Sequence, residues 1–139
     1  MIVDEFFSSP PVSVAATADQ LHTLRAVVRA RGQRHDLSAD AVADLVLAVD
    51  EAANILLRHT RSHSALICTV GVGIDTLRVV LTGTTSAIID TGTTSFSWFV
   101  LQTLVDGVAL DQRPSAIKGS TETWAVIVTI EMAREPKHG

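Results

Sequence analysis

The segment AVDEAANILLRHT, residues 48–60, places three chemically capable side chains in an apolar stretch with helical spacing. Glu51 comes first, Asn54 follows about one helical turn later, and His59 lies further along the chain. A carboxylate base and an amide that can ligate a metal ion are side chains that phosphoryl transfer uses. The same residues also fit an ordinary buried helix with polar positions. The rest of the sequence has to decide between these two interpretations.

The composition indicates an ordered globular protein. Of the 139 residues, 47% are hydrophobic and 19% are charged, which suits one domain with its own core. The formal net charge of −4 argues against direct binding to nucleic acid, because such binding favours basic surfaces. A lone cysteine, Cys68, cannot form an internal disulfide and favours a reducing compartment.

The sequence also predicts where the domain lies. No apolar run is long enough to span a bilayer, which takes about 20 residues. Asp4 and Glu5 stand where a signal peptide needs positive charge. We therefore expect one cytoplasmic domain over residues 1–139, with an ordered core at residues 11–132 and a frayed tail at 133–139.

The first half of the chain predicts one strand and two helices. A β-branched run within residues 10–17 predicts the strand. Residues 17–32 have leucines and valines at helical spacing, and Gly32 is expected just past the end of this helix. Residues 35–61 carry the strongest pattern, with Ser38 as the expected N-cap. The apolar stripe of this second helix consists of Val42, Leu45, Val46, Val49, Ala53 and Leu56.

The second half predicts four strands and a third helix. Two β-branched runs separated by the short GIDT segment indicate a hairpin. Residues 84–95 are rich in Thr, Ser and Gly and are expected to form a loop before a helix at 96–107. The element order predicts an α+β two-layer sandwich, mostly antiparallel, with helices on one face of the sheet. The four β-branched runs are residues 65–73, 76–83, 108–114 and 123–132.

Two motifs in this order carry a family resemblance. The second helix has the pattern AV-x-E-A…H and the third ends in L-V-D-x-V. With the element order, they resemble the RsbW-type anti-sigma factors of the histidine-kinase-like (GHKL) ATPase superfamily over residues 11–132. The segment FSWFVLQTLVDGV is similar to mycobacterial-type members that control a stress sigma factor. The matching residues are Ala48, Val49, Glu51, Ala52, His59, Leu104, Val105, Asp106 and Val108.

The resemblance implies a GHKL fold and a homodimer that binds a sigma factor and keeps it from RNA polymerase. A STAS-type antagonist is expected to compete for it, and many family members phosphorylate that antagonist on serine with Mg-ATP. Such kinases use a glutamate as base and, four residues later, an asparagine that holds magnesium. An aspartate after a central strand binds adenine, and glycines before the third helix let the backbone reach the phosphates.

The nucleotide positions of this family are mostly unmatched here. Glu51 fits, but Ile55 occupies the asparagine position, and Asn54 should face about 100° away from it. The strand at 76–83 is followed by no acid. Asp90, Gly92 and Thr93 come too close to the third helix to serve instead.

The glycines that open the third helix are also missing. Ser95 and Ser97 stand in their place, with Phe96 between them and Trp98 next. Ser95 suits the N-cap position. We expect Phe96 or Trp98 to fill the former nucleotide site, because an empty cavity would cost stability.

The sequence thus favours an anti-sigma factor that acts by protein binding and has no cofactor. Two alternatives stay open. One is an active serine kinase with Mg-ATP, using Glu51 as base and Asn54 near the metal, and the other is a scaffold or dimerisation module. The predicted partner-binding residues are Arg25, Arg29, Phe96, Trp98 and Phe99.

The predicted partner-binding residues were chosen for different reasons. Arg25 matches an arginine that the resemblance assigns to sigma-factor and antagonist contact, within a basic helix end that includes Arg29, Arg31 and Arg34. Adjacent aromatics on one helix cannot all face inward, so at least one is expected on the surface as an interface anchor.

A metal site is the weaker interpretation of two histidines. His59 and His63 have i, i+4 spacing near Cys68. Histidines near a helix end are favoured by the helix dipole, and this is the expectation here.

Overall fold

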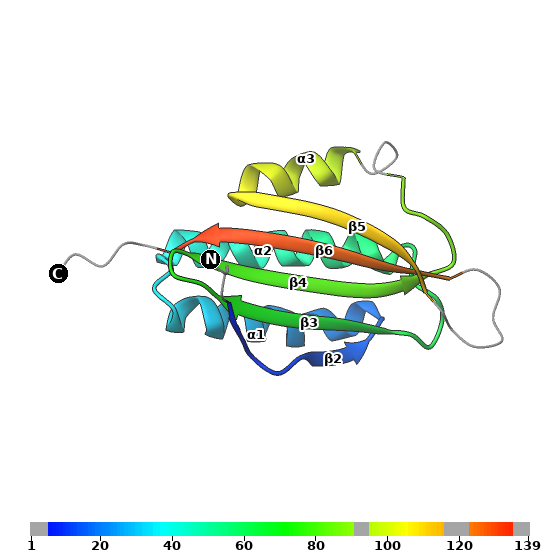
Figure 1. Cartoon of the computed structure of the whole chain (residues 1–139), viewed down its shortest axis with the longest axis horizontal. Helices are drawn as coiled ribbons and strands as arrows, with labels where there is room; N and C mark the ends of the chain where they lie inside the picture. The colour runs from blue at the N-terminus through cyan, green and yellow to red at the C-terminus, as the bar shows by residue number, and fades with distance from the viewer. Residues whose placement is uncertain (1–5, 91–94, 116–122, 135–139) are drawn as a thin grey trace, which may run out of the picture.

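The computed structural model describes residues 6–90, 95–115 and 123–134. It is a two-layer α+β structure in which an antiparallel sheet carries helices on one face (Figure 1), so the predicted fold class is confirmed. No helix within these three ranges is both long enough and apolar enough to cross a membrane. The strands are β1 (Phe7–Ser8), β2 (Val12–Ala15), β3 (Ala65–Val72), β4 (Thr76–Thr85), β5 (Gly107–Ser115) and β6 (Thr123–Ala133). The helices are the 3-10 turn η1 (Ala18–Gln20), α1 (Leu21–Arg34), α2 (Ala39–Leu57) and α3 (Ser95–Leu104).

The sheet has the order β1-β3-β4-β6-β5, and β2 also pairs with β3. Every one of these pairs is antiparallel. The predicted hairpin is the β3–β4 pair, and the two C-terminal strands pair as predicted. In Figure 1, α2 lies behind β4 and β6, with α1 on the β3 side and α3 on the β5 side. Helix α2 is therefore the central helix of the layer that covers this face of the sheet.

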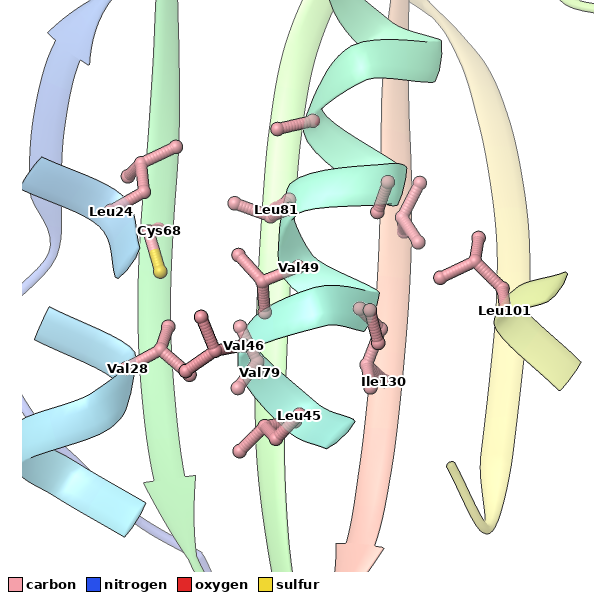
Figure 2. Close-up of a cluster of buried hydrophobic side chains, with 14 of the residues drawn as sticks. Leu24, Val28, Leu45, Val46, Val49, Cys68, Val79, Leu81, Leu101 and Ile130 are labelled. Carbon is pink, nitrogen blue, oxygen red and sulfur yellow. The ribbon is translucent and has the colours of Figure 1, made fainter. Parts of the chain in front are cut away.

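Helix α2 begins and packs as its sequence predicts. The Ser38 hydroxyl accepts a hydrogen bond from the Ala41 N–H at 3.0 Å, which confirms the N-cap. The buried face of α2 packs on β4 and β6, and its flanks contact α1 and α3. Burying each Val or Leu stabilises the fold by about 1.5–3 kcal/mol. Figure 2 shows part of this core, with Leu45, Val46 and Val49 of α2 facing Val79, Leu81 and Ile130 of the sheet.

The end of the first helix differs from the prediction. Helix α1 continues to Arg34, so Gly32 lies inside the helix and is buried. A Cβ atom at Gly32 would lie 3.2 Å from side-chain carbons of both Leu37 and Val42. The glycine therefore allows close packing of α1 against the start of α2, and it does not end the helix.

Three boundaries in the second half also differ. Helix α3 ends at Leu104, before the predicted end at residue 107, because Gly107 already pairs with Glu131 of β6 as the first residue of β5. The predicted loop at residues 84–95 begins later, because β4 runs to Thr85, which pairs with Trp124 of β6. The predicted tail at 133–139 is wrong at its first two residues, because β6 runs to Ala133 and Arg134 is anchored by its side chain. Residues 135–139 lie outside the described part of the chain. Pairing with a neighbouring strand extended both strands, and the sequence pattern alone did not show this.

Arg134 joins two turns at one end of the molecule, the one between α1 and α2 and the one between β3 and β4. Its guanidinium donates hydrogen bonds to the carbonyls of His35 at 3.0 Å, Gly73 at 2.5 Å and Ile74 at 3.3 Å. It also forms an ion pair with Asp36 at 3.1 Å. Asp36 has a left-handed backbone with φ of 68°, so the turn between α1 and α2 is held in a conformation that few residues adopt.

We expect Arg134→Ala to lower the free energy of unfolding by about 1–3 kcal/mol, because three carbonyls lose their donor. A matched control is Arg113→Ala, which removes an exposed ion pair with Asp111 and should cost less than about 1 kcal/mol. Urea denaturation of both variants measures the difference. Equal effects would show that the Arg134 contacts do not stabilise this end of the fold.

Candidate functional site

The outer face of α2 contributes three polar side chains to one cleft. Glu51, Asn54 and Arg58 have i, i+3 and i+7 spacing, so they share a face of the helix. They line a cleft of about 540 Å³ that opens between α2 and the segment leading into α1. The cleft thus combines a carboxylate, an amide and a guanidinium. Its other lining residues are Ala16, Thr17, Ala18 and Leu57.

The neighbouring residue, Ile55, faces the opposite direction. Its side chain is only 2% exposed and belongs to the core, whereas Asn54 is exposed. Helix α2 is a regular α-helix throughout Ala39–Leu57, so no local bulge turns Asn54 toward the sheet. The predicted divergence of the two side chains is confirmed. The inward position at this turn of α2 therefore offers no oxygen atom to a metal ion.

Arg58 also lines this cleft, although it was not predicted from the sequence as a site residue. Its Nη2 atom lies 3.4 Å from the Ser97 hydroxyl oxygen, a long hydrogen bond that connects the end of α2 to the start of α3. The signal that identifies it is the spacing of seven residues from Glu51, which is about two helical turns.

Residues 86–90, which follow β4, are held against β5. The buried Thr85 hydroxyl donates to the Ala87 carbonyl at 2.7 Å. Ile89 is only 2% exposed, and its N–H donates to Gln112 Oε1 at 2.7 Å. Gln112 Nε2 donates in return to the Ile89 carbonyl at 3.0 Å. An isoleucine locked by two hydrogen bonds therefore fills space beside the sheet directly after β4.

Gln112 was also missed by sequence reasoning. The signal is a polar residue at a position where β5 alternates inward, two residues after Leu110 and four after Val108. Asp90, the last of residues 86–90, is exposed. Gly92 and Thr93, the other residues of the rejected adenine motif, lie outside the described part of the chain.

The aromatic residues of α3 divide between surface and core. Phe96 is 79% exposed and Phe99 is 56% exposed, which confirms that at least one of the three lies on the surface. Trp98 is partly buried and packs against the core, beside the fully buried Leu101. Of Phe96 and Trp98, one of which was expected to pack inward, Trp98 does so and Phe96 does not, because the inward face of α3 is set by the i, i+3 pair Trp98 and Leu101. That Trp98 fills a former nucleotide site stays a prediction. The side chain of Ser95, the predicted N-cap, lies outside what the structure describes.

Arg25 is paired within the molecule. Its Nη1 atom lies 2.7 Å from Asp50 Oδ1, so the ion pair links α1 to α2. Asp50 therefore faces α1 and is no partner of Glu51. Arg29 is exposed on the same helix as Arg25. Arg31 and Arg34 line a separate cleft at the other end of α1.

The histidines and the cysteine do not form a metal site within the described residues. His63 lies in the turn after α2 with a left-handed backbone, φ of 61°. Cys68 is buried in β3, and this burial raises the pKa of its thiol to about 11. The thiol is therefore protonated at neutral pH and is a packing residue in the core.

An antiparallel sheet with its helices on one face, and a glutamate on the central helix, define the class of protein. The chain belongs to the histidine kinase-like ATPase domain family, whose model matches residues 14–117. The sequence is 38% identical over 113 residues to anti-sigma-F factor RsbW of Mycobacterium tuberculosis, in strains CDC 1551 / Oshkosh and ATCC 25618 / H37Rv. This match covers 78% of the chain and 66% of the relative, so the chain spans about two thirds of that protein's length.

A solved structure supports the same fold. The crystal structure of the RsbU and RsbW domains of Rv1364c from Mycobacterium tuberculosis matches with a TM-score of 0.63. The match covers 94% of this chain and 35% of that one at 15% identity, so it is a likeness of fold. The resemblance to RsbW-type members of this superfamily is thus confirmed.

Gln112→Ala is expected to free residues 86–90, which follow β4, from their contact with β5. The Ile89 N–H and carbonyl would lose their partners, so we expect the free energy of unfolding to fall by about 1–2 kcal/mol. The amide of Ile89 should also exchange faster with solvent. Gln102→Ala on the exposed face of α3 is the control and should change neither quantity. Unchanged protection of Ile89 in Gln112→Ala would contradict the locking role of Gln112.

Proposed function

We propose that this protein is an anti-sigma factor that sequesters a stress-response sigma factor by direct binding and is relieved by a STAS-type antagonist. One observation carries the proposal: exposed Phe96 and Phe99 on the outer face of α3, in a chain 38% identical to an anti-sigma-F factor. Large aromatic side chains in water favour burial against a partner, and such residues anchor protein interfaces.

The packing beneath these phenylalanines supports this proposal. Trp98 and Leu101 hold α3 against the core on its inward side, so Phe96 and Phe99 are presented on a fixed helix. A fixed surface loses less conformational freedom on binding than a mobile one. In this proposal Trp98 supports Phe96 and Phe99, which make the contacts with the partner.

The outer face of α1 is the second part of the proposed surface. Arg29 is exposed there, and Arg25 is held in place by Asp50 while its side chain stays 38% exposed. A held guanidinium can still accept a carboxylate of an acidic partner on its free side. We propose that Arg25 and Arg29 contact the sigma factor or the antagonist.

The proposal includes a degenerate nucleotide site, in which other residues stand where the family's Mg-ATP-binding residues would be. Ile55 takes the inward position on α2, and Ile89 is packed where β4 ends. A second candidate function, a serine kinase, is favoured by one observation: Glu51 and Asn54 line the same cleft. In that mechanism Glu51 would accept the proton of the attacking hydroxyl and Asn54 would contribute to holding the metal.

The proposed assembly is a homodimer bound to the sigma factor. The sheet face turned away from the helices offers a candidate surface for the second copy, because its centre carries small and β-branched side chains without charge. Two such faces can pack about 10 Å apart. The residues at this centre are Ile67, Thr69, Val80, Thr82, Ile127 and Thr129.

We expect Phe96→Ala combined with Phe99→Ala to weaken sigma-factor binding by at least about 2 kcal/mol, which is about thirtyfold. Both side chains are mostly exposed, so the melting temperature should stay nearly unchanged. Gln102→Ala with Thr103→Ala, also on the exposed face of α3, is the matched control. Calorimetry with the stress sigma factor of the same genome gives the affinity, and light scattering should show two copies of this chain in the complex.

Three results would contradict these proposals. A wild-type chain that captures no sigma factor would leave only the scaffold function. Equal affinity of the phenylalanine variant and its control would place the interface elsewhere on the molecule. A single copy of this chain in the complex would exclude the homodimer.

Mg-ATP is expected not to raise the melting temperature. Binding at a hundredfold excess over Kd would stabilise the fold by about 2.7 kcal/mol, which a thermal scan detects easily. A clear rise would favour the kinase instead. Asn54→Ala is the control for that outcome, because it should abolish the rise if Asn54 helps to hold the metal.

A further inference from the structure

A second cleft lies at the β1 edge of the sheet, away from Glu51. It encloses about 340 Å³ between β1, with the residues just after it, and the C-terminal end of α1. Phe7 pairs with Val72 in the antiparallel register, so their side chains share the face of the sheet that α1 covers. Val70, two residues earlier in β3, lies on that face too. The floor of the cleft is therefore apolar.

The α1 side of this cleft is basic. Arg31, Arg34 and His35 line it, and no carboxylate is among its lining residues. Within the described ranges, neither Arg31 nor Arg34 has an ion-pair partner. This concentration of positive charge stands out in a chain with a formal net charge of −4. The helix dipole favours cations at the end of α1, but it does not explain why they meet an apolar floor across a cleft.

The pKa of His35 reflects the same concentration of positive charge. Burial lowers the pKa of its imidazole, and the charges of Arg134, Arg34 and Arg31 lower it further. Asp36 acts in the opposite direction and is the weakest of these influences. Arg134 already donates to three carbonyls and Asp36, so the arginines with free donors are Arg31 and Arg34.

We propose that this cleft binds a phosphate monoester. The two guanidinium groups supply forked donors that match phosphate oxygens, and His35 adds a third donor when it is protonated. The apolar floor formed by Phe7, Val70 and Val72 accepts the carbon part of the ester. This inference does not depend on the anti-sigma function. The monoester can be a free small molecule or a phosphorylated side chain of a protein.

The test follows the imidazole of His35 by NMR in the intact chain, with His35→Gln used to assign its signal. Titration with phenyl phosphate, at ionic strength matched with sodium chloride, should raise the pKa of His35. The expected rise is about 0.5–1 pH unit, since a bound anion favours the protonated ring. The protonated imidazole should bind the phosphate more tightly than the neutral one, but phenyl phosphate gains its second negative charge in the same pH range, at a pKa of about 6. The shift in the pKa of His35, and not the pH dependence of the affinity, is therefore the readout.

The control variants decide whether the cleft is responsible. Arg31→Ala with Arg34→Ala should abolish the rise, and Arg29→Ala, on the same helix but outside the cleft, should keep it. Circular dichroism should show both variants folded, because all three arginines are wholly or partly exposed. No rise in the wild type, or an equal rise in the double variant, would overturn the proposal.

Two further ligands identify the source of the phosphate. A phosphoserine peptide that binds at least tenfold more tightly than phenyl phosphate, while its unphosphorylated form does not bind, would assign the cleft to a phosphorylated protein segment. Equal or weaker binding of that peptide would assign it to a small monoester. Inorganic phosphate should bind more weakly than phenyl phosphate, because it leaves the apolar floor uncovered. Inorganic phosphate binding equally well would overturn the monoester assignment.

Discussion

The burial of one face of α2 is the constraint on which the rest of the structure depends. This helix packs on β4 and β6 and is flanked by α1 and α3. It cannot rotate about its axis without exposing its apolar stripe to water, which costs about 1.5–3 kcal/mol for each large side chain. The orientation of α2 about its own axis therefore determines where each of its other side chains points. Glu51, Asn54 and Arg58 face the cleft, and Ile55 faces the core.

The same constraint makes the inner side of the helix layer a packed apolar region. Ile55, Ile89 and Leu101 are each at most 2% exposed, and Trp98 packs against the same core. The remaining polar groups in this region are satisfied internally, since Gln112 makes two hydrogen bonds with the Ile89 backbone. In the described residues no buried side-chain donor or acceptor lacks a partner, as is usual for a well-packed protein core.

The outer side of the helix layer has a different chemical character on each helix. Helix α1 is basic, and Arg25 ties it to the acidic α2 through Asp50. Helix α3 has no charged side chain and presents Phe96 and Phe99 to solvent. Charged surfaces give a partner its orientation and speed of approach, whereas exposed aromatics supply most of the binding energy. Helices α1 and α3 flank α2 on opposite sides, so the basic surface and the aromatic surface are separated by α2.

The sequence by itself determined the three α-helices, the five longer strands, the direction in which the apolar face of α2 points, and the fold class. The two-residue strand β1 was not predicted, because it exists only through its pairing with β3. Periodicity is a local property, so the apolar stripe, the Ser38 cap and the opposite directions of Asn54 and Ile55 could be predicted from it. Only the tertiary structure decided which distant residues meet. The Gln112–Ile89 lock, the Arg25–Asp50 pair and the contacts of Arg134 join residues that are 23, 25 and up to 99 positions apart. Gly32 was misinterpreted for the same reason, because its role depends on how closely α1 approaches α2. Local spacing determines which way a side chain points, and only packing in three dimensions determines what it touches.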